Sequence, residues 1–196
     1  MHFKFSKKEI SDLIVSWLTI TVSFAWAISG GVFNLAHFGS VLPVIAIAVG
    51  TGFILHELAH KFVAIKFGAV AEYRAWAVGL VIALFGALIG VVFAAPGAVY
   101  IFGPHIRKRE NGLISLAGPM TNVFIAVFFF LLTIVVPTEI VLFVSLPAIS
   151  INLFLALFNM LPIPPLDGSK VFIWNPIIWG IVFVPLVLAF LAFRAF

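Results

Sequence analysis

The chain has 196 residues, of which 64% are hydrophobic and 9% charged, and no soluble domain can bury that much apolar surface, so lipid must be its solvent. The formal net charge of +4 does not indicate a nucleic-acid partner, because the basic residues cluster at the ends of apolar segments, where membrane orientation and lipid headgroups account for them. The absence of cysteine excludes disulfides, thiolate metal ligands and cysteine nucleophiles.

At about 20 residues per span, the chain has room for about five or six transmembrane helices and almost nothing else. We therefore predict an all-α polytopic membrane protein that forms one membrane-embedded domain over residues 1–196.

The first predicted span covers residues 13–28 and follows a polar segment that contains three lysines. A cleavable signal peptide is the alternative, since Ala25-Trp26-Ala27 has the small-x-small form of a cleavage site, but the apolar run continues to Gly31 and favours a retained span. Residues 30–40 contain no lysine or arginine. The positive-inside rule therefore predicts a cytoplasmic N-terminus.

The second predicted span, residues 41–66, contains the run His-Glu-Leu-Ala-His at 56–60. On a helix, residues four apart lie on one face, so the imidazoles of His56 and His60 can bind one metal ion. Glu57 projects from nearly the same side and is left free to take a proton from water, as in zinc hydrolases. Charged groups within a membrane segment are costly and usually mark function, which argues against a chance match. Two lysines after the motif place it on the cytoplasmic side of the membrane.

Residues 75–103 are apolar and long enough to span, but basic residues flank both ends, so both ends should prefer the cytoplasm. We therefore predict a re-entrant segment, with a β-hairpin whose strands are Val91-Val92-Phe93 and Ala98-Val99-Tyr100. Such backbone is tolerated only where protein or a wet cavity covers it. An ordinary sixth span is the alternative.

The third and fourth predicted spans cover residues 111–137 and 140–161, and a last span covers residues 175–196. The third opens with small residues that permit close helix packing, and its Asn122 can hydrogen-bond across helices. After the fourth span, three prolines at 162, 164 and 165 prevent an α-helix. The backbone should therefore open there at membrane depth and line a cavity.

A catalytic zinc site usually has three protein ligands, and the acidic residues are few enough to test in turn. Six of the seven belong to the motif, the N-terminal segment or predicted loops: Glu57, Glu9, Asp12, Glu72, Glu110 and Glu139. The remaining histidines also fall in predicted loops: His2, His37 and His105. Asp167, in the proline-opened segment, is therefore the predicted third ligand. The alternative is that it only caps the following helix.

The predicted topology supports this choice. If residues 75–103 are re-entrant, the fourth span runs inward and brings Asp167 to the depth of His60. A full extra crossing would leave Asp167 near the opposite face, about 20 Å or more away in a core about 30 Å thick. One ion could not bind both residues at that distance.

These motifs resemble those of the site-2 protease family of intramembrane zinc metalloproteases. The matching parts are H-E-x-x-H at 56–60, Ala-Gly-Pro-x-x-Asn ending at Asn122, and Asn-x-x-Pro-x-Pro-x-Leu-Asp-Gly at 159–168, which place a catalytic core at about 41–170. The resemblance implies that one Zn²⁺ is bound by His56, His60 and Asp167, that Glu57 is the base and that Asn159 helps to position substrate. It also implies a re-entrant β element after the motif helix, although residues 75–103 are longer and more apolar than the family pattern suggests.

The predicted reaction is hydrolysis of peptide bonds within or near transmembrane segments of a membrane-protein substrate, as in regulated intramembrane proteolysis, at a site facing the cytoplasm. The chain lacks the Gly-x-Gly-Asp run of aspartyl intramembrane proteases, offers no spare membrane histidine to a serine such as Ser29, and has Val63 where a metzincin has glycine. The ligand set favours zinc over manganese or iron. A catalytically inactive scaffold and a divalent-metal transporter using the same ligands are the alternatives. Substrate identity and oligomeric state are left open.

Overall fold

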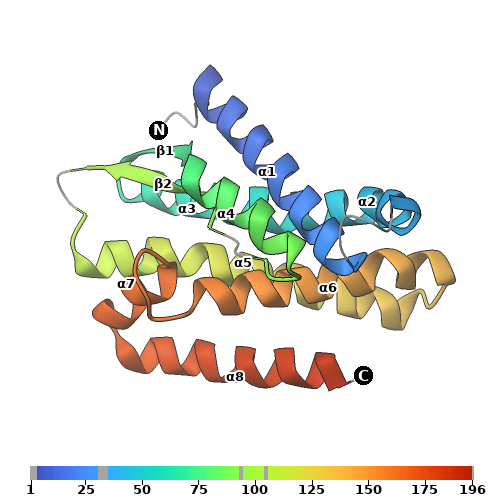
Figure 1. Ribbon diagram of the computed structural model, residues 1–196. Coiled ribbons are helices and arrows are strands. Elements are labelled where there is room, and N and C mark those ends of the chain that lie inside the picture. The colour runs from blue at the N-terminus through green and yellow to red at the C-terminus, as the bar shows by residue number, and fades with distance from the viewer. Residues whose placement is uncertain (1–3, 31–34, 93–94, 104–105, 196) are drawn as a thin grey trace.

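The computed structural model describes residues 4–30, 35–92, 95–103 and 106–195. Within these ranges, five helices are long and apolar enough to cross a bilayer. They are α1 (Lys7–Ile28), the continuous helix Leu35–Lys66, α5 (Lys108–Val135), α6 (Glu139–Asn159) and α8 (Pro176–Ala195). The predicted all-α polytopic membrane fold is confirmed. Figure 1 shows α5, α6 and α8 with roughly parallel axes and successive helices running in opposite directions, and α6 packs against both of the others.

Two helices begin six residues before the predicted spans. α1 begins at Lys7 because the side chain of Ser6 accepts a hydrogen bond from the Glu9 N–H at 3.0 Å and caps the helix. The second span begins at Leu35, so the expectation of a loop at His37 is wrong, and this residue lies in the first turn of a helix. His2 and His105 lie outside the described residues.

The helix with the H-E-x-x-H run has three parts: α2 (Leu35–Val49), a π-helical turn η1 (Gly50–Ile54) and α3 (Leu55–Lys66). Such turns are frequent at functional sites. A Cβ atom at Gly52 would lie 3.0 Å from Asn152 Oδ1, and the Gly52 carbonyl accepts a hydrogen bond from Asn122 at 2.9 Å. The turn thus brings α5 and α6 against the chain just before His56.

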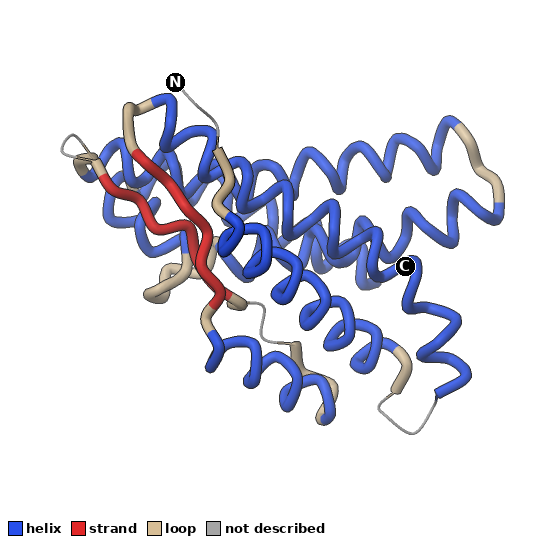
Figure 2. The backbone as a smooth tube through the Cα atoms, turned by 90° about the horizontal axis from the view of Figure 1, so that it is seen from above, coloured by secondary structure: helices blue, strands red, loops and turns tan. Residues whose placement is uncertain are grey.

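A two-stranded antiparallel sheet joins the two ends of the predicted re-entrant segment. β1 (Val70–Ala75) pairs with β2 (Gly97–Phe102), with Val70 opposite Phe102 and Ala75 opposite Gly97. Between them lies α4 (Ala77–Leu88), whose 12 residues span about 18 Å, against a hydrocarbon core of about 30 Å. The chain therefore leaves and returns at one sheet, as the re-entrant prediction requires, and Figure 2 shows both strands side by side.

One predicted strand of this segment is wrong. Val91 and Val92 lie in no strand, and Phe93 lies outside the described residues. Gly90 has a φ of +79°, and the Val91 N–H bonds to the Gly86 carbonyl at 2.9 Å, so this backbone closes the end of α4 and is not free to pair. The predicted strand at residues 98–100 is confirmed within β2, and its partner is β1, which the sequence interpretation treated as a loop.

The proline segment interrupts the helices as predicted. α6 ends at Asn159, residues 160–166 contain no α-helix, and α7 (Asp167–Trp174) follows. A Cβ atom at Gly168 would lie 2.1 Å from the Met160 carbonyl oxygen. Only glycine therefore lets the start of α7 pack this closely against the end of α6.

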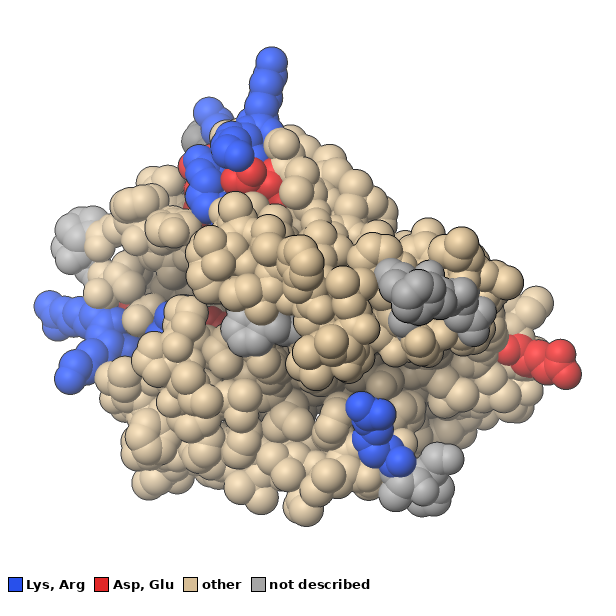
Figure 3. Space-filling model, viewed as in Figure 1, with Lys and Arg blue, Asp and Glu red and all other residues tan. Residues whose placement is uncertain are grey.

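The surface matches a membrane environment. Large apolar side chains are exposed along α5, α6 and α8, where they can face lipid. In Figure 3 most of the visible surface is uncharged, and most of the visible basic side chains gather near the amino-terminal ends of α1 and α5, with one more near the carboxyl end of α8.

Candidate metal centre

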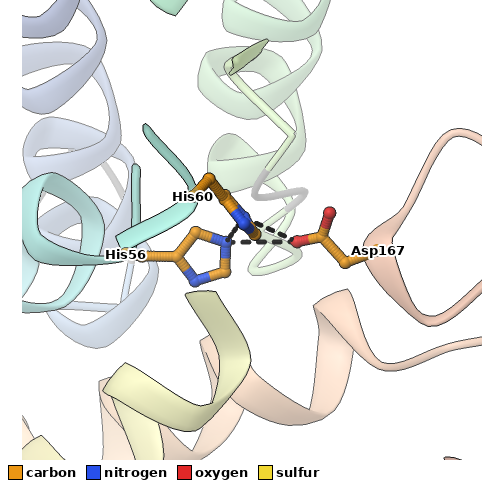
Figure 4. A group of neighbouring side chains, drawn as sticks. All are labelled: His56, His60 and Asp167. Carbon is orange, nitrogen blue, oxygen red and sulfur yellow. Dashed lines mark hydrogen bonds and ion pairs between the residues drawn. The ribbon is translucent and has the colours of Figure 1, made fainter. Parts of the chain in front are cut away.

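Three predicted ligands meet in the interior of the protein. His56 and His60 stand one turn apart on α3, and Asp167 is the first residue of α7. The Nε2 atoms of the two histidines lie 3.0 Å apart. Asp167 Oδ2 lies 3.3 Å from His56 Nε2 and 3.0 Å from His60 Nε2 (Figure 4). All three side chains are buried. Asp167 thus faces the imidazole pair and does more than start a helix.

The separations suit a small tetrahedral cation. With zinc–ligand bonds of about 2.0–2.1 Å, two ligand atoms of a tetrahedral site lie about 3.3 Å apart. The three measured distances are 3.0, 3.0 and 3.3 Å. Two imidazoles and one carboxylate are also a donor set that zinc hydrolases use. The residues present therefore fit zinc, although their assignment as ligands stays a prediction.

Hydrogen bonds on the far side of each ring determine which nitrogen faces the site. His60 Nδ1 lies 2.7 Å from the Ile114 carbonyl oxygen, which can only accept, so Nδ1 carries the proton. Asn122 donates its amide N–H groups to the carbonyl of Gly52 and to Asn152 Oδ1, both at 2.9 Å. Its own Oδ1 is thereby turned toward His56 Nδ1, 2.6 Å away. Both Nε2 lone pairs therefore point into the site, ready to bind a metal.

This network confirms that Asn122 hydrogen-bonds across helices and adds a role that the sequence interpretation missed. Asn152 on α6 was also missed, although a buried amide within an apolar helix is a signal for such a role. Lys170, whose Nζ lies 3.4 Å from Asp167 Oδ1, is a third residue missed. The amides link α3, α5 and α6 directly behind one ligand.

We expect Asn122→Ala to weaken zinc binding about 10- to 100-fold, because His56 loses the acceptor that orients its ring. Zinc affinity measured by competition with a chelator checks this. Thr121→Ala is the matched control, since its hydroxyl donates to the Ala117 carbonyl of its own helix. Equal affinity in the two variants would contradict the orienting role.

Helix α5 approaches the histidines through a glycine. A Cβ atom at Gly118 would lie 2.5 Å from Nε2 of both His56 and His60. Gly118 stands one turn after Ile114, whose carbonyl holds His60, so one face of α5 both supports and closely approaches the imidazole pair. This explains why the middle residue of the Ala-Gly-Pro run is glycine.

Glu57 and Asn159 line the same cavity as the three predicted ligands. Glu57 is 7% exposed, and its Oε2 has no hydrogen-bond partner among the described residues. Asn159 donates one amide hydrogen to the Leu155 carbonyl at 3.0 Å. A buried carboxylate oxygen without a partner beside a predicted metal site is arranged to meet water or substrate.

The sheet contributes one strand to this cavity. Gly97, Ala98, Val99 and Ile101 of β2 are among the lining residues, whereas none of the lining residues belongs to β1. The cavity has about 740 Å³ of empty space, its open mouth included. It is therefore bounded by a β-strand on one side and by the histidines and Asp167 on another.

The fold and the site together define a polytopic membrane protein with a His–His–Asp site of the kind that zinc hydrolases use. The chain is 48% identical over 188 residues to "Putative zinc metalloprotease MJ0611" of Methanocaldococcus jannaschii, covering 94% of both chains. It is 31% identical to "Putative zinc metalloprotease YwhC" of Bacillus subtilis, over 67% of this chain and 68% of that one. It is 32% identical to "Putative zinc metalloprotease Rip2" of Mycobacterium tuberculosis, over 74% of this chain and 62% of that one. No protein-family model and no solved structure matches the chain. The chain belongs to the site-2 protease family of zinc metalloproteases.

Proposed function

We propose that the protein is an intramembrane zinc metalloprotease, with one Zn²⁺ per chain, that hydrolyses peptide bonds within or near transmembrane segments of other membrane proteins. The observation that supports this best is the convergence of His56, His60 and Asp167 beside Glu57 in a bundle of membrane-length helices. We further propose that residues 41–170 form the catalytic core. The N-terminus and the site would face the cytoplasm, because basic residues precede both α1 and α5.

In this mechanism, Glu57 is the general base. His56, His60 and Asp167 would hold a zinc ion, whose Lewis acidity would polarise the scissile carbonyl and lower the pKa of a nearby water toward about 7. Glu57 takes a proton from that water as the water oxygen attacks the scissile carbonyl carbon, and it passes the proton to the amine nitrogen as the C–N bond breaks. Asn159 has a second amide hydrogen besides the one donated to Leu155, and it donates this hydrogen to the developing oxyanion.

A helical substrate shields its carbonyl groups, so we propose that it unwinds and pairs with β2. Along β1, the backbone groups of successive residues point alternately toward β2 and away from it. The N–H groups of Tyr73 and Ala75 point away, toward α1, whereas the Trp76 N–H bonds to the Pro96 carbonyl at 2.7 Å. The even-numbered residues therefore form the hydrogen bonds between the two strands. The opposite residues Val99 and Ile101 therefore direct their backbone groups to the outer edge of β2. No other described residue hydrogen-bonds to them there. Tyr100 itself belongs to the ladder, so the odd-numbered residues on either side of it are the candidates for pairing with substrate.

We expect Val99→Pro to lower the rate of cleavage about tenfold or more while zinc binding stays unchanged. Proline removes an N–H that a substrate strand would use, and the sheet tolerates it because that N–H is not part of the ladder. Cleavage of a designed single-span substrate in liposomes, with zinc content measured in parallel, checks this. Val99→Ala keeps the N–H and is the control. Equal rates in the two variants would argue against strand addition.

The experiment that tests the proposed function compares the purified protein with His56→Ala and Asp167→Ala. We expect about one zinc per wild-type chain, a large loss of zinc in both variants, and cleavage of the designed substrate only by the wild type. Equal zinc content in all three proteins would overturn the ligand assignment. Zinc binding without cleavage by the wild type would favour an inactive scaffold or a transporter.

A further inference from the structure

Two carboxylates of α1 occupy the outer edge of β1. Glu9 Oε1 accepts a hydrogen bond from the Tyr73 N–H at 3.1 Å, and Asp12 Oδ2 accepts one from the Ala75 N–H at 3.4 Å. The two carboxylates are three residues apart on the helix, and the two outward N–H groups are two residues apart on the strand. Both spacings are about 5–7 Å, so each carboxylate can meet one N–H group. The side chains thus replace the carbonyl groups of a third strand.

The charge of Glu9 is balanced by the helix that carries the histidines. Lys61 Nζ lies 2.7 and 2.6 Å from the two carboxylate oxygens of Glu9, and the side chains of Glu9 and Lys61 are 1% and 2% exposed. Lys61 directly follows His60 on α3. Separating such a buried pair leaves an uncompensated charge, so the pair holds its geometry. Glu9 therefore connects α1, the sheet and the metal-site helix at one point.

Tyr73 packs the sheet against α1 and η1. Its hydroxyl donates to Ser16 Oγ of α1 at 2.9 Å, and its ring packs edge-on against Phe53 of η1, with 5.6 Å between centroids. Burial raises the pKa of the Tyr73 hydroxyl well above its ordinary value, so it stays protonated and keeps donating. A Cβ atom at Gly97 would lie 2.4 Å from this hydroxyl, so β2 also rests directly on Tyr73.

We propose that Glu9, assisted by Asp12, is a positioning residue for the substrate. By bonding the outer edge of β1, Glu9 closes that edge to strand addition and fixes the sheet against α1. The outer edge of β2, which borders the cavity, then accepts the substrate strand in one register. The inference rests on the proposed protease function and deepens it: the anchored sheet determines which peptide bond reaches the site.

Two double variants test this. Glu9→Gln with Lys61→Met removes both buried charges but keeps an oxygen that accepts from the Tyr73 N–H. Glu9→Leu with Lys61→Met removes the charges and the acceptor. The two proteins differ only in the bond to the sheet. The readouts are zinc content, the rate of cleavage of a designed single-span protein with two central glycines in its transmembrane helix, and the position of each cut by mass spectrometry.

We expect both variants to bind zinc like the wild type, since the ion pair between Glu9 and Lys61 and the bond from Tyr73 to Glu9 involve none of the predicted ligands. The Gln variant should cut at the wild-type bond. The Leu variant should cut at least tenfold more slowly and at several neighbouring bonds. If the Leu variant still cuts at the single wild-type bond, the proposal is overturned, whatever the rate of cleavage. A purely structural role lowers the amount of active enzyme without changing which bond is cut. Displaced cuts in the Gln variant would overturn it as well. Absence of cleavage by the wild type would instead refute the proposed function.

Disulfide cross-linking tests whether the outer edge of β1 is closed to substrate without altering Glu9. Because the chain has no native cysteine, every cross-link must form at the introduced one. In the Glu57→Gln background, which should trap substrate, Phe102→Cys on β2 is compared with Val70→Cys on β1. These residues lie opposite each other in the register and are 63% and 69% exposed. A single-cysteine version of the designed substrate should cross-link to Cys at position 102 and not to Cys at position 70. Equal cross-linking at both positions would overturn the proposal.

Discussion

Glu57→Gln is expected to abolish measurable cleavage while the zinc content stays at the wild-type level. Glutamine preserves the size of the side chain but cannot take a proton from water at neutral pH, and general-base catalysis contributes about 10²- to 10⁴-fold to rate. The three predicted ligand atoms belong to other residues, so metal binding should persist. Product formation from the designed single-span substrate and zinc per chain by atomic spectroscopy are the measurements.

Glu139→Gln is the matched control, because Glu139 is exposed at the start of α6, far along the chain from the cavity lining. It should cleave at the wild-type rate. Cleavage by Glu57→Gln at the wild-type rate would remove Glu57 from the mechanism. Zinc flux into vesicles that survives in Glu57→Gln, together with no cleavage by any variant, would favour the transporter interpretation.

Gly118→Ala is expected to abolish zinc binding and cleavage together. The added Cβ atom would lie 2.5 Å from Nε2 of His56 and of His60, where no carbon atom fits. The imidazoles cannot retreat easily, since Asn122 and the Ile114 carbonyl hold them from behind. The substitution therefore displaces either the rings or α5, and both changes separate the predicted ligands. Zinc content and cleavage rate are the measurements.

Gly180→Ala provides the control for a glycine substitution in a membrane helix, because a Cβ atom there meets nothing within 4 Å. This variant should bind zinc and cleave like the wild type. Stoichiometric zinc in Gly118→Ala would show that α5 can move without disturbing the site, contrary to the packing described.

The candidate site could be predicted from the sequence because its key residues obey local rules. Helical spacing places His56 and His60 together, and Asp167 stood out because few acidic residues exist and only this one follows a proline break. The supporting groups follow no such rule. Every residue has a backbone carbonyl, so the sequence does not mark the one at Ile114. Its role depends on how α5 packs against α3. Asn152 acts through Asn122, a neighbour on another helix.

The fold was least predictable around the sheet. β1 has only six residues, and its partner lies beyond an intervening helix, so no short-range hairpin signal exists. Glu9 and Asp12 were assigned to a polar N-terminal segment, yet both are buried. Glu9 is bonded by Lys61 and by the Tyr73 N–H, and Asp12 accepts from the Ala75 N–H, and all three of these partners lie more than 50 residues away. Hydropathy treats a charged residue as exposed and cannot register a distant counter-ion.

The placement of the predicted ligands on α3 and α7 has a consequence for durability. These helices are remote in the chain and are joined to their surroundings by a π-helical turn on one side and a proline-broken segment on the other. An ion bound by both helices would cross-link α3 and α7 in the folded state. Free zinc would therefore stabilise the folded protein by mass action. Zinc depletion of cells would then shorten the lifetime of the protein and also abolish the proposed cleavage.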